Sequence, residues 1–168
     1  MRNVILTNEQ GDNLGEMEIW EAHKGNGRLH KAFSVLIFTP DRTKVLLQKR
    51  ADWKLFGLHW ANSCCSHPKP KEDPLANATK RLTEEMGIDC ELTYCGAFTY
   101  HAPDPNGKGS EYEYDMVFMG IAEENVTITP DSKEVADYRW VTIDDLKKEE
   151  NIAPWFPRVL DIALAYHG

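Results

Sequence analysis

Apolar residues along this chain gather into short runs that are separated by clusters of turn-forming residues. Residues 4–6 and 17–20 are two such runs. They flank the polar segment 8–13, so the pattern predicts an N-terminal β-hairpin. The longer apolar run 32–38 predicts a buried strand. After a break the chain returns through the run 45–47, which predicts a second hairpin.

A helix over about residues 74–86 is the clearest element that the pattern predicts. Asp73 suits the N-cap position, Pro74 suits the first helical position, and Gly87 is placed to end the helix. Four apolar residues recur at spacings of three, four and four, which predicts one face packed in the core. They are Leu75, Ala78, Leu82 and Met86.

Three further strands are predicted at about 91–101, 112–121 and 136–141, with a turn at 103–107 between the first two. A capping-box pattern over residues 142–145 predicts a short helix. The apolar residues of the last segment predict a final amphipathic helix. They are Val159, Leu160, Ile162, Ala163 and Leu164.

Strand hairpins interleaved with a few helices indicate the α+β class, an α/β sandwich in which helices flank a mixed sheet. The length of 168 residues suits one domain, which we place at residues 1–168. Apolar residues make up 42% and charged residues 27%, as in globular proteins. No apolar run approaches the roughly 20 residues that span a bilayer, and the first residues lack a signal-peptide core. We therefore expect a cytoplasmic protein without membrane insertion.

The formal net charge of −8 argues against a nucleic-acid partner, because no basic stripe is present to neutralise phosphates. A small anionic substrate, held by a metal and a few Lys or Arg, is compatible with this charge. Four cysteines include an adjacent pair, and a chain of this length does not need disulfides, so we expect free thiols. They are Cys64, Cys65, Cys90 and Cys95.

Segment 66–88 resembles the Nudix box, whose pattern is Gly, five residues, Glu, seven residues, then Arg-Glu-apolar-any-Glu-Glu-any-Gly-apolar. The spacing is kept at five positions, which are Glu72, Glu84, Glu85, Gly87 and Ile88. Three positions depart from the pattern: Ser66 stands for Gly, Lys80 for Arg and Arg81 for Glu.

Arg81 is the departure with the largest chemical consequence. Residues four apart share a helix face, so the regular box stacks carboxylates there to hold Mg²⁺ against a diphosphate. In this chain the face offers Glu85 and a guanidinium, which suits bidentate capture of a phosphate better than activation of a water by metals. On the helix alone, a solvated face with an Arg81–Glu85 ion pair is an equally good interpretation.

Histidines and glutamates outside the helix suggest a metal site. His23, His30 and His67 offer three imidazoles. Glu111 and Glu113 alternate along a predicted strand and therefore point to the same side. Together these five residues would leave one coordination position open. Such a mixed nitrogen and oxygen site suits Mn²⁺, Zn²⁺ or Mg²⁺.

Four segments resemble the type 1 isopentenyl diphosphate isomerases, a divergent branch of the Nudix superfamily: 28–34, 62–68, 111–113 and 153–156. Segment 62–68 is the most specific of them, and the resemblance extends over about residues 3–160. It implies a Nudix-type fold and a metal-dependent conversion of isopentenyl diphosphate to dimethylallyl diphosphate. The implied cofactors are a divalent metal at the His/Glu site and Mg²⁺ with the substrate diphosphate, the latter held by Glu85. The implied partner is the small prenyl diphosphate substrate, and we expect a monomer or weak dimer.

Moving an isolated double bond requires one proton to be added and another removed, hence an acid and a base on opposite sides of a flat carbocation-like species. The resemblance implies that Cys65 and Glu113 fill these roles, with Tyr100 as the hydrogen-bonding partner of Glu113. It also implies that Trp155 stabilises the cation through the π face of its indole. Cys64 would point the other way in an extended segment and fits a small buried apolar residue.

For the diphosphate, the resemblance implies basic ligands at Arg50, Lys54 and Arg81. Two features differ from the family. Ile19 stands where a Lys is usual, four residues before the first metal His, and the loop 54–60 is one residue short and lacks Pro-Gly. Lys24 and Lys31 are candidate substitutes for the missing lysine.

Two other functions compete with the isomerase. A Nudix pyrophosphohydrolase acting on a nucleoside or prenyl diphosphate would need a substitute for the missing box carboxylate, at Glu72 or Glu84. A non-enzymatic binding domain would use Cys64, Cys65 and His67 for a structural zinc, although the spacing between the last two is tight for such a site.

Overall fold

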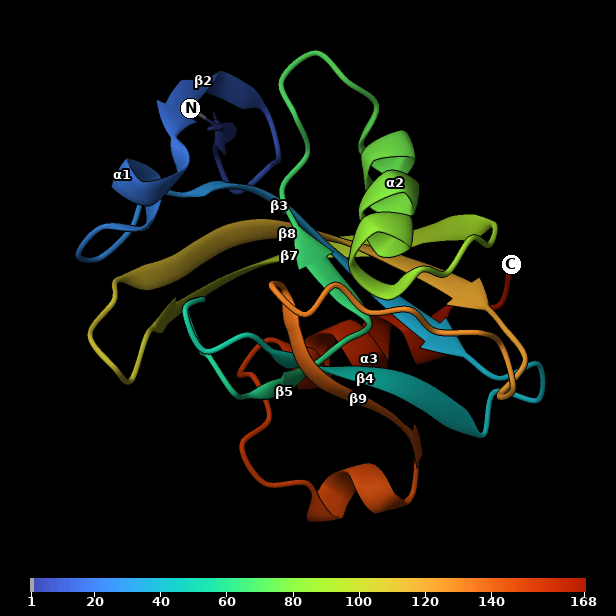
Figure 1. The fold of residues 1–168 in the computed structure, drawn as a ribbon. Helices are drawn as coiled ribbons and strands as arrows, with labels where there is room; N and C mark the ends of the chain where they lie inside the picture. The colour runs from blue at the N-terminus through green and yellow to red at the C-terminus, as the bar shows by residue number, and fades with distance from the viewer. Residues whose placement is uncertain (1) are drawn as a thin grey trace.

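The computed structural model describes residues 2–168 (Figure 1). The strands are β1 (Asn3–Thr7), β2 (Asn13–Glu18), β3 (His30–Phe38), β4 (Lys44–Arg50), β5 (Trp60–Ala61), β6 (Cys64–Ser66), β7 (Leu92–Pro103), β8 (Ser110–Ile121) and β9 (Val135–Thr142). The helices are α1 (Ile19–His23), α2 (Pro74–Met86) and α3 (Phe156–Ala165), with a 3-10 turn η1 (Asp145–Lys148). All these strands belong to one mixed sheet.

Strand β3 organises the sheet. Along its whole length it pairs in parallel with β8, which pairs in turn with β7 in antiparallel orientation. The other edge of β3 is shared by β1, β6 and β4, and β9 pairs with β4. Strands β6 and β8 therefore lie on opposite edges of β3. The pairing confirms a mixed sheet that begins with a β1–β2 hairpin.

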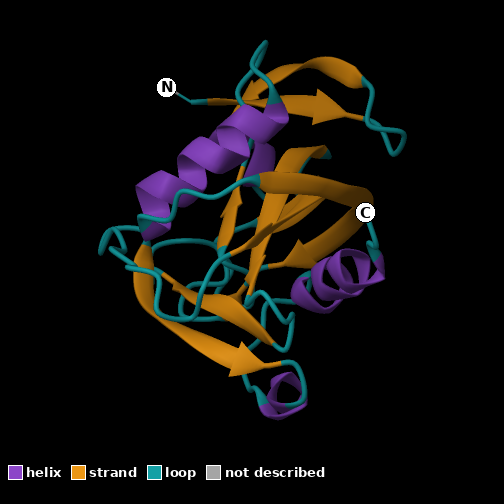
Figure 2. Ribbon diagram, turned by 90° about the vertical axis from the view of Figure 1, so that its right-hand side faces the viewer, coloured by secondary structure: helices purple, strands orange, loops and turns teal. Residues whose placement is uncertain are grey.

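The two faces of the sheet enter two different hydrophobic cores. Val35 and Ile37 of β3 pack in one core with Leu82 of α2, whereas Leu36 packs in the other with Val159 of α3. This division follows from the alternation of side chains along a strand. Figure 2 shows the two helices on either side of the strands. The predicted sandwich of helices around a mixed sheet is confirmed.

Helix α2 follows its local signals with one exception. Asp73 accepts a hydrogen bond from the backbone N–H of Ala76 at 2.9 Å, and Gly87 ends the helix with a φ of 70°. The prediction that Leu75 packs in the core is wrong, because this side chain is 38% exposed. Asn77 is buried near this end of the helix instead, and its amide fastens the preceding loop through hydrogen bonds.

The strand predicted over 17–20 is too long by two residues. It ends at Glu18, and helix α1 begins at Ile19. The Glu18 carboxylate accepts hydrogen bonds from the backbone N–H groups of Trp20 and Glu21, at 2.8 and 3.1 Å, and so caps a helix that the apolar pattern does not reveal. Among residues 2–168, no helix is long and apolar enough to cross a bilayer.

The predicted second hairpin is present only in part. Strands β3 and β4 follow one another, but they pair only at Phe38 and Val45, and β4 runs mainly along β9. Strands β5 and β6 were not predicted, because two or three residues are too short to show a periodicity. The four cysteines are free thiols, as predicted.

Candidate active site

Strand register brings predicted site residues into one row across the sheet. His30 of β3 lies opposite Glu113 of β8, and Glu113 lies opposite Tyr100 of β7. Glu111 and Glu113 both have buried side chains next to histidines, which confirms that they point to the same side of β8. The geometry of the site therefore depends on the pairing of β3, β7 and β8.

His23, His30, His67 and Glu113 form a cluster, and their ligand atoms all lie within 4.8 Å of one another. Oε1 of Glu113 is 2.9 Å from Nε2 of His67 and 3.4 Å from Nε2 of His30. Glu111 stands beside the cluster, with Oε2 3.0 Å from Nε2 of His23. These atoms lie close enough to bind one metal ion at about 2.0–2.2 Å once their side chains move slightly closer together.

Backbone carbonyls fix the orientation of two of the imidazoles. Nδ1 of His23 is 2.7 Å from the carbonyl oxygen of Ile19, and Nδ1 of His30 is 2.7 Å from that of Arg28. A carbonyl only accepts, so each Nδ1 carries a proton and each Nε2 presents a lone pair in the neutral ring. Nε2 of His30 is buried and has no hydrogen-bond partner in the part of the chain that the structure describes. Lone pairs that face a carboxylate fit a cation held between them, as in metal sites of proteins.

Burial and the two glutamates act on the histidines in opposite directions. Burial lowers the pKa of His67 to about 3, so this imidazole is neutral. Burial also disfavours the charged form of His23, but the hydrogen bond and charge of Glu111 outweigh it and raise the pKa of His23 to about 9. A metal ligand must be a neutral imidazole, so a metal bound here would displace that proton. The carboxylates of the cluster thus stabilise a positive charge among the histidines, carried either by a proton on His23 or by a metal ion.

His30→Gln is expected to empty this site of metal. The side chain is fully buried, and glutamine keeps most of its volume but removes the orphaned nitrogen. Metal content after purification and extensive dialysis, measured by mass spectrometry, should fall from about one ion per chain to below about a tenth. His167→Gln, at an exposed histidine far along the chain from the cluster, is the control and should retain the ion. Retention of a full equivalent by His30→Gln would show that the cluster is not the metal site.

A small inner cavity of about 30 Å³ lies next to the cluster. Its lining includes all four predicted catalytic residues, which are Cys65, Tyr100, Glu113 and Trp155. Cys65 comes from β6 and Glu113 from β8, so the two approach from opposite edges of β3. The Tyr100 hydroxyl donates a hydrogen bond to Oε2 of Glu113 at 2.6 Å, which confirms the predicted contact.

Cys65 and Glu113 hold different protonation states. Burial raises the pKa of Cys65 to about 12, although the charge of Arg50 opposes this rise, so the residue is a thiol at neutral pH. Burial alone would raise the pKa of Glu113, but the His30 and His67 imidazoles beside its carboxylate hold that pKa well below its usual range. The cavity therefore contains one group that carries a proton and one carboxylate that can accept one.

The adjacent cysteines face opposite sides of the sheet. Cys64 is fully buried in the core beside α2, whereas Cys65 lines the inner cavity. This confirms the prediction for an extended segment. It also excludes the alternative of a structural zinc held jointly by Cys64, Cys65 and His67.

Asn62 is a site residue that sequence reasoning did not identify, although it stands in the most specific segment. Its Oδ1 accepts hydrogen bonds from the Cys65 thiol and from the Trp155 indole N–H, both at 3.1 Å. Its Nδ2 donates to the carbonyl of Cys64 at 2.7 Å. One buried amide thus fixes the positions of two residues that line the inner cavity.

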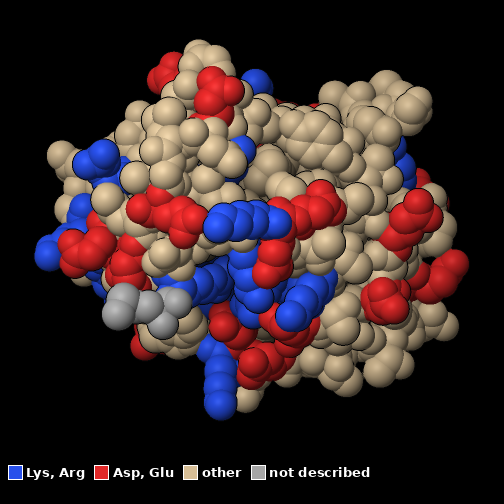
Figure 3. All heavy atoms as spheres, turned by 90° about the horizontal axis from the view of Figure 1, so that it is seen from above, with Lys and Arg blue, Asp and Glu red and all other residues tan. Residues whose placement is uncertain are grey.

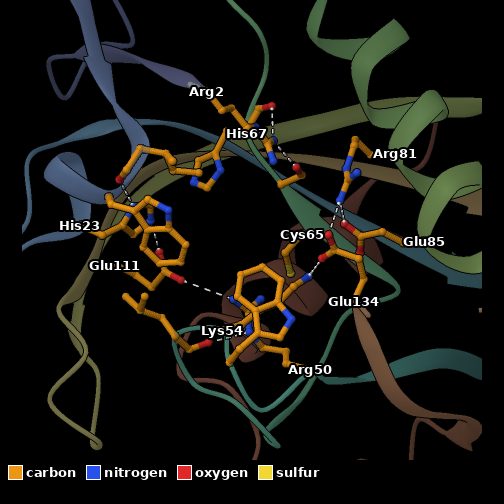
Figure 4. A pocket seen from close by; sticks show the side chains of 15 residues that line it. Arg2, His23, Arg50, Lys54, Cys65, His67, Arg81, Glu85, Glu111 and Glu134 are labelled. Carbon is orange, nitrogen blue, oxygen red and sulfur yellow. Dashed lines mark hydrogen bonds and ion pairs between the residues drawn. The ribbon is translucent and has the colours of Figure 1, made fainter. Parts of the chain in front are cut away.

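An outer cavity of about 250 Å³ adjoins the inner one, since Cys65 and His67 line both. Figure 4 shows its lining, with Cys65 between Arg81 and Arg50. The three predicted diphosphate ligands line it, and each is paired with a glutamate: Arg50 with Glu111 at 3.6 Å, Lys54 with Glu134 at 2.5 Å and Arg81 with Glu85 at 2.5 Å. On the face seen in Figure 3, Lys and Arg side chains gather near the middle among acidic ones. The lining of the outer cavity has four Lys or Arg side chains against three Glu, a small local excess of cations in a chain of net charge −8.

The Arg81–Glu85 pair lies at this cavity and not on a solvated helix face. Glu85 is fully buried, and its second oxygen accepts a hydrogen bond from the Gln48 amide at 3.1 Å. Arg81 contacts Glu134 as well. Glu85 stands outside the His/Glu cluster, so its predicted role as a separate Mg²⁺ ligand remains a prediction.

Position 19, where the family has a lysine, carries no positive charge for the diphosphate in this chain. Ile19 lines the outer cavity, but neither Lys24 nor Lys31 does. Lys24 is exposed and pairs with Glu21, and Lys31 points away from the face that carries His30. The cavity instead contains Arg2, which no motif singled out.

Comparison with known proteins agrees with this geometry. The family model of the NUDIX domain matches residues 28–161. The chain is 42% identical over 166 residues to an isopentenyl-diphosphate Delta-isomerase of Nocardia farcinica, covering 95% of this chain and 93% of that protein. It is 40% identical to isopentenyl-diphosphate Delta-isomerase 2 of Photorhabdus laumondii, covering 94% and 90%.

A solved structure extends the likeness of fold to nearly the whole chain. A protein of Deinococcus radiodurans superposes with a TM-score of 0.72 at 12% identity, covering 99% of this chain and 100% of that one. The similarity therefore includes the N-terminal hairpin and α1 as well as the domain matched at 28–161. On the strength of both comparisons, the chain belongs to the isopentenyl-diphosphate Delta-isomerase family and has a Nudix fold.

Proposed function

We propose that this protein converts isopentenyl diphosphate to dimethylallyl diphosphate. The observation that carries the proposal is the inner cavity, in which a thiol and a carboxylate approach from opposite edges of β3. A hydrolase has no need of this pair. An isomerase needs it, because one proton must be added and another removed on a flat carbon skeleton.

Each residue of the inner cavity would have a separate role in the isomerisation. Cys65 and Glu113 exchange the two protons, and Tyr100 holds the Glu113 carboxylate in place through its short hydrogen bond. Trp155 is only 2% exposed, and its ring lies 5.6 Å from that of Tyr100. An indole face in such a dry site stabilises a passing carbocation by roughly 2 kcal/mol. Burial also keeps water from trapping the cation as an alcohol.

The two cavities match the two ends of the substrate. The apolar five-carbon end would enter the inner cavity, and the diphosphate would lie in the outer one among Arg50, Lys54 and Arg81. The metal that the His/Glu cluster would hold, Mn²⁺, Zn²⁺ or Mg²⁺, supplies positive charge that tunes the acidity of Glu113. Mg²⁺ at Glu85 would accompany the diphosphate.

Isomerase activity is tested by incubation with isopentenyl diphosphate and Mg²⁺ in D₂O. The expected result is dimethylallyl diphosphate that carries deuterium, with no release of phosphate. Mass spectrometry follows the product and a colorimetric assay follows phosphate. Phosphate release without isomerisation would instead favour the pyrophosphohydrolase, and absence of both products would favour a binding function.

We further propose that the protein acts in the cytoplasm as one domain, and as a monomer or weak dimer. Both cores of the sandwich share the single sheet, which supports one cooperative domain. Sedimentation at several concentrations tests the oligomeric state.

A further inference from the structure

The outer cavity has an apolar side chain where the family places a cation. Ile19 lies at the first position of α1, four residues before His23, and lines the cavity. An isoleucine cannot neutralise a diphosphate, so binding must draw on another cation of the cavity. The two lysines nearest in sequence point elsewhere.

Arg2 stands next to this position. The backbone N–H of Ile19 donates to the carbonyl of Arg2 at 3.0 Å, which places the two residues side by side. The Arg2 side chain then reaches across the cavity rim, where Nη2 donates to Oγ of Ser66 at 2.7 Å and to the carbonyl of His67 at 3.3 Å. In Figure 4, Arg2 and His67 lie along the upper edge of the pocket, with Arg81 to their right.

Ser66 is itself a departure from the Nudix box, which has Gly at this place. A glycine offers no hydroxyl, so the shorter of the two contacts of Arg2, the one to Ser66, exists only because of this change. Ile19 and Ser66 thus depart from their family patterns at two positions that both adjoin Arg2. One change removes a cation, and the other anchors a new one.

Arg2 is also the cation of this cavity that has no carboxylate partner. Within residues 2–168 the structure gives it no ion pair, whereas Arg50, Lys54 and Arg81 each contact a glutamate. Burial and the like charge of Arg81 lower the pKa of Arg2, and the charges of the neighbouring glutamates, Glu85, Glu134 and Glu84, offset only part of this. Two guanidinium groups that repel one another across an open space suit an anion placed between them.

A second cavity, of about 200 Å³, adjoins the outer cavity. Arg2, His67 and Arg81 line both of them, so the Arg2 guanidinium stands at the boundary. Lys69 and Lys80 line the second cavity. A diphosphate at this boundary would therefore meet cations on both sides.

We propose that Arg2, positioned by Ser66, binds the substrate diphosphate in place of the lysine that is absent at position 19. This assignment rests on the proposed function for the identity of the ligand. The Arg2 guanidinium would make one charge-assisted hydrogen bond to a phosphate oxygen. A positive side chain at position 2 or at position 19 should therefore serve equally well.

The test is direct binding of inorganic diphosphate with Mg²⁺, measured by titration calorimetry on the intact protein. Arg2→Gln should weaken binding about 10- to 100-fold, the loss that one charge-assisted hydrogen bond brings. Adding Ile19→Lys to Arg2→Gln should recover most of that loss. Lys24→Gln, at an exposed lysine near the cavity, is the matched control and should bind like the wild type. Metal content and the melting temperature of each variant show whether the fold and the His/Glu cluster are intact.

The turnover assay separates this proposal from the isomerase itself. Arg2→Gln should raise KM for isopentenyl diphosphate by a similar factor while kcat changes much less, because Arg2 lies outside the inner cavity. Unchanged binding of diphosphate in Arg2→Gln, or a failure of Ile19→Lys to rescue it, would overturn the assignment of Arg2. A wild-type protein that binds diphosphate through Arg2 but makes no dimethylallyl diphosphate would instead refute the proposed reaction.

Discussion

Cys65→Ala is expected to abolish turnover of isopentenyl diphosphate while the protein stays folded. The substitution removes the sulfur that lines the inner cavity from the β6 side, and alanine puts no exchangeable proton in its place. Loss of a positioned acid or base costs roughly 10²- to 10⁴-fold in rate. We expect the upper end, because the site is buried and bulk water cannot readily take the place of the thiol as proton donor.

The neighbouring cysteine provides a matched control for this experiment. Cys64→Ala removes the same atom one residue away, on the opposite face of the sheet. It should lower the melting temperature, since it leaves a small void in the core, but keep kcat close to that of the wild type. Wild-type rates from Cys65→Ala, measured beside a circular dichroism spectrum, would refute the proton-transfer mechanism.

Glu113→Gln is expected to abolish turnover and to weaken metal binding at the same time. Glutamine has nearly the same shape but carries no charge. The substitution therefore removes the proton acceptor that faces Cys65 and the negative oxygen that lies 2.9 Å from His67. The rate should fall by roughly 10³-fold or more, because two functions are lost in one residue. Single-turnover kinetics and metal analysis measure the two losses separately.

Glu124→Gln serves as the control for a change in charge alone, because Glu124 pairs with Lys44 on the surface. It should leave both the rate and the metal content unchanged. If Glu113→Gln loses its metal yet regains full activity when Mn²⁺ or Mg²⁺ is added in excess, the carboxylate acts only as a ligand. The assignment of Glu113 to proton transfer would then be wrong.

Features that depend on near neighbours in the chain could be predicted from the sequence. The ends of α2 follow from Asp73 and Gly87, and the common side of Glu111 and Glu113 follows from the alternation of a strand. The opposite directions of Cys64 and Cys65 follow from the same rule. In each case two or three adjacent residues fix the geometry.

Features that depend on contacts between distant segments could not be predicted. The Arg2 side chain meets Ser66 across 64 positions, and Asn62 meets Trp155 across 93. No periodicity connects such pairs, because strand pairing brings them together. Helix α1 escaped prediction for a different reason: its five residues are too few for an apolar stripe, and only the Glu18 cap marks its start.

The single row formed by His30, Glu113 and Tyr100 has a consequence for how insertions and deletions act on this protein. A shift of β8 by one residue relative to β3 would turn Glu111 and Glu113 to the far face and bring Tyr112 and Tyr114 into their places. The sheet could tolerate such an error, but the ligand set would be lost entirely. Metal affinity therefore depends on the register of three strands, β3, β7 and β8. A titration with Mn²⁺ or Zn²⁺ would distinguish a variant whose strands keep this register from a variant that folds with a shifted one.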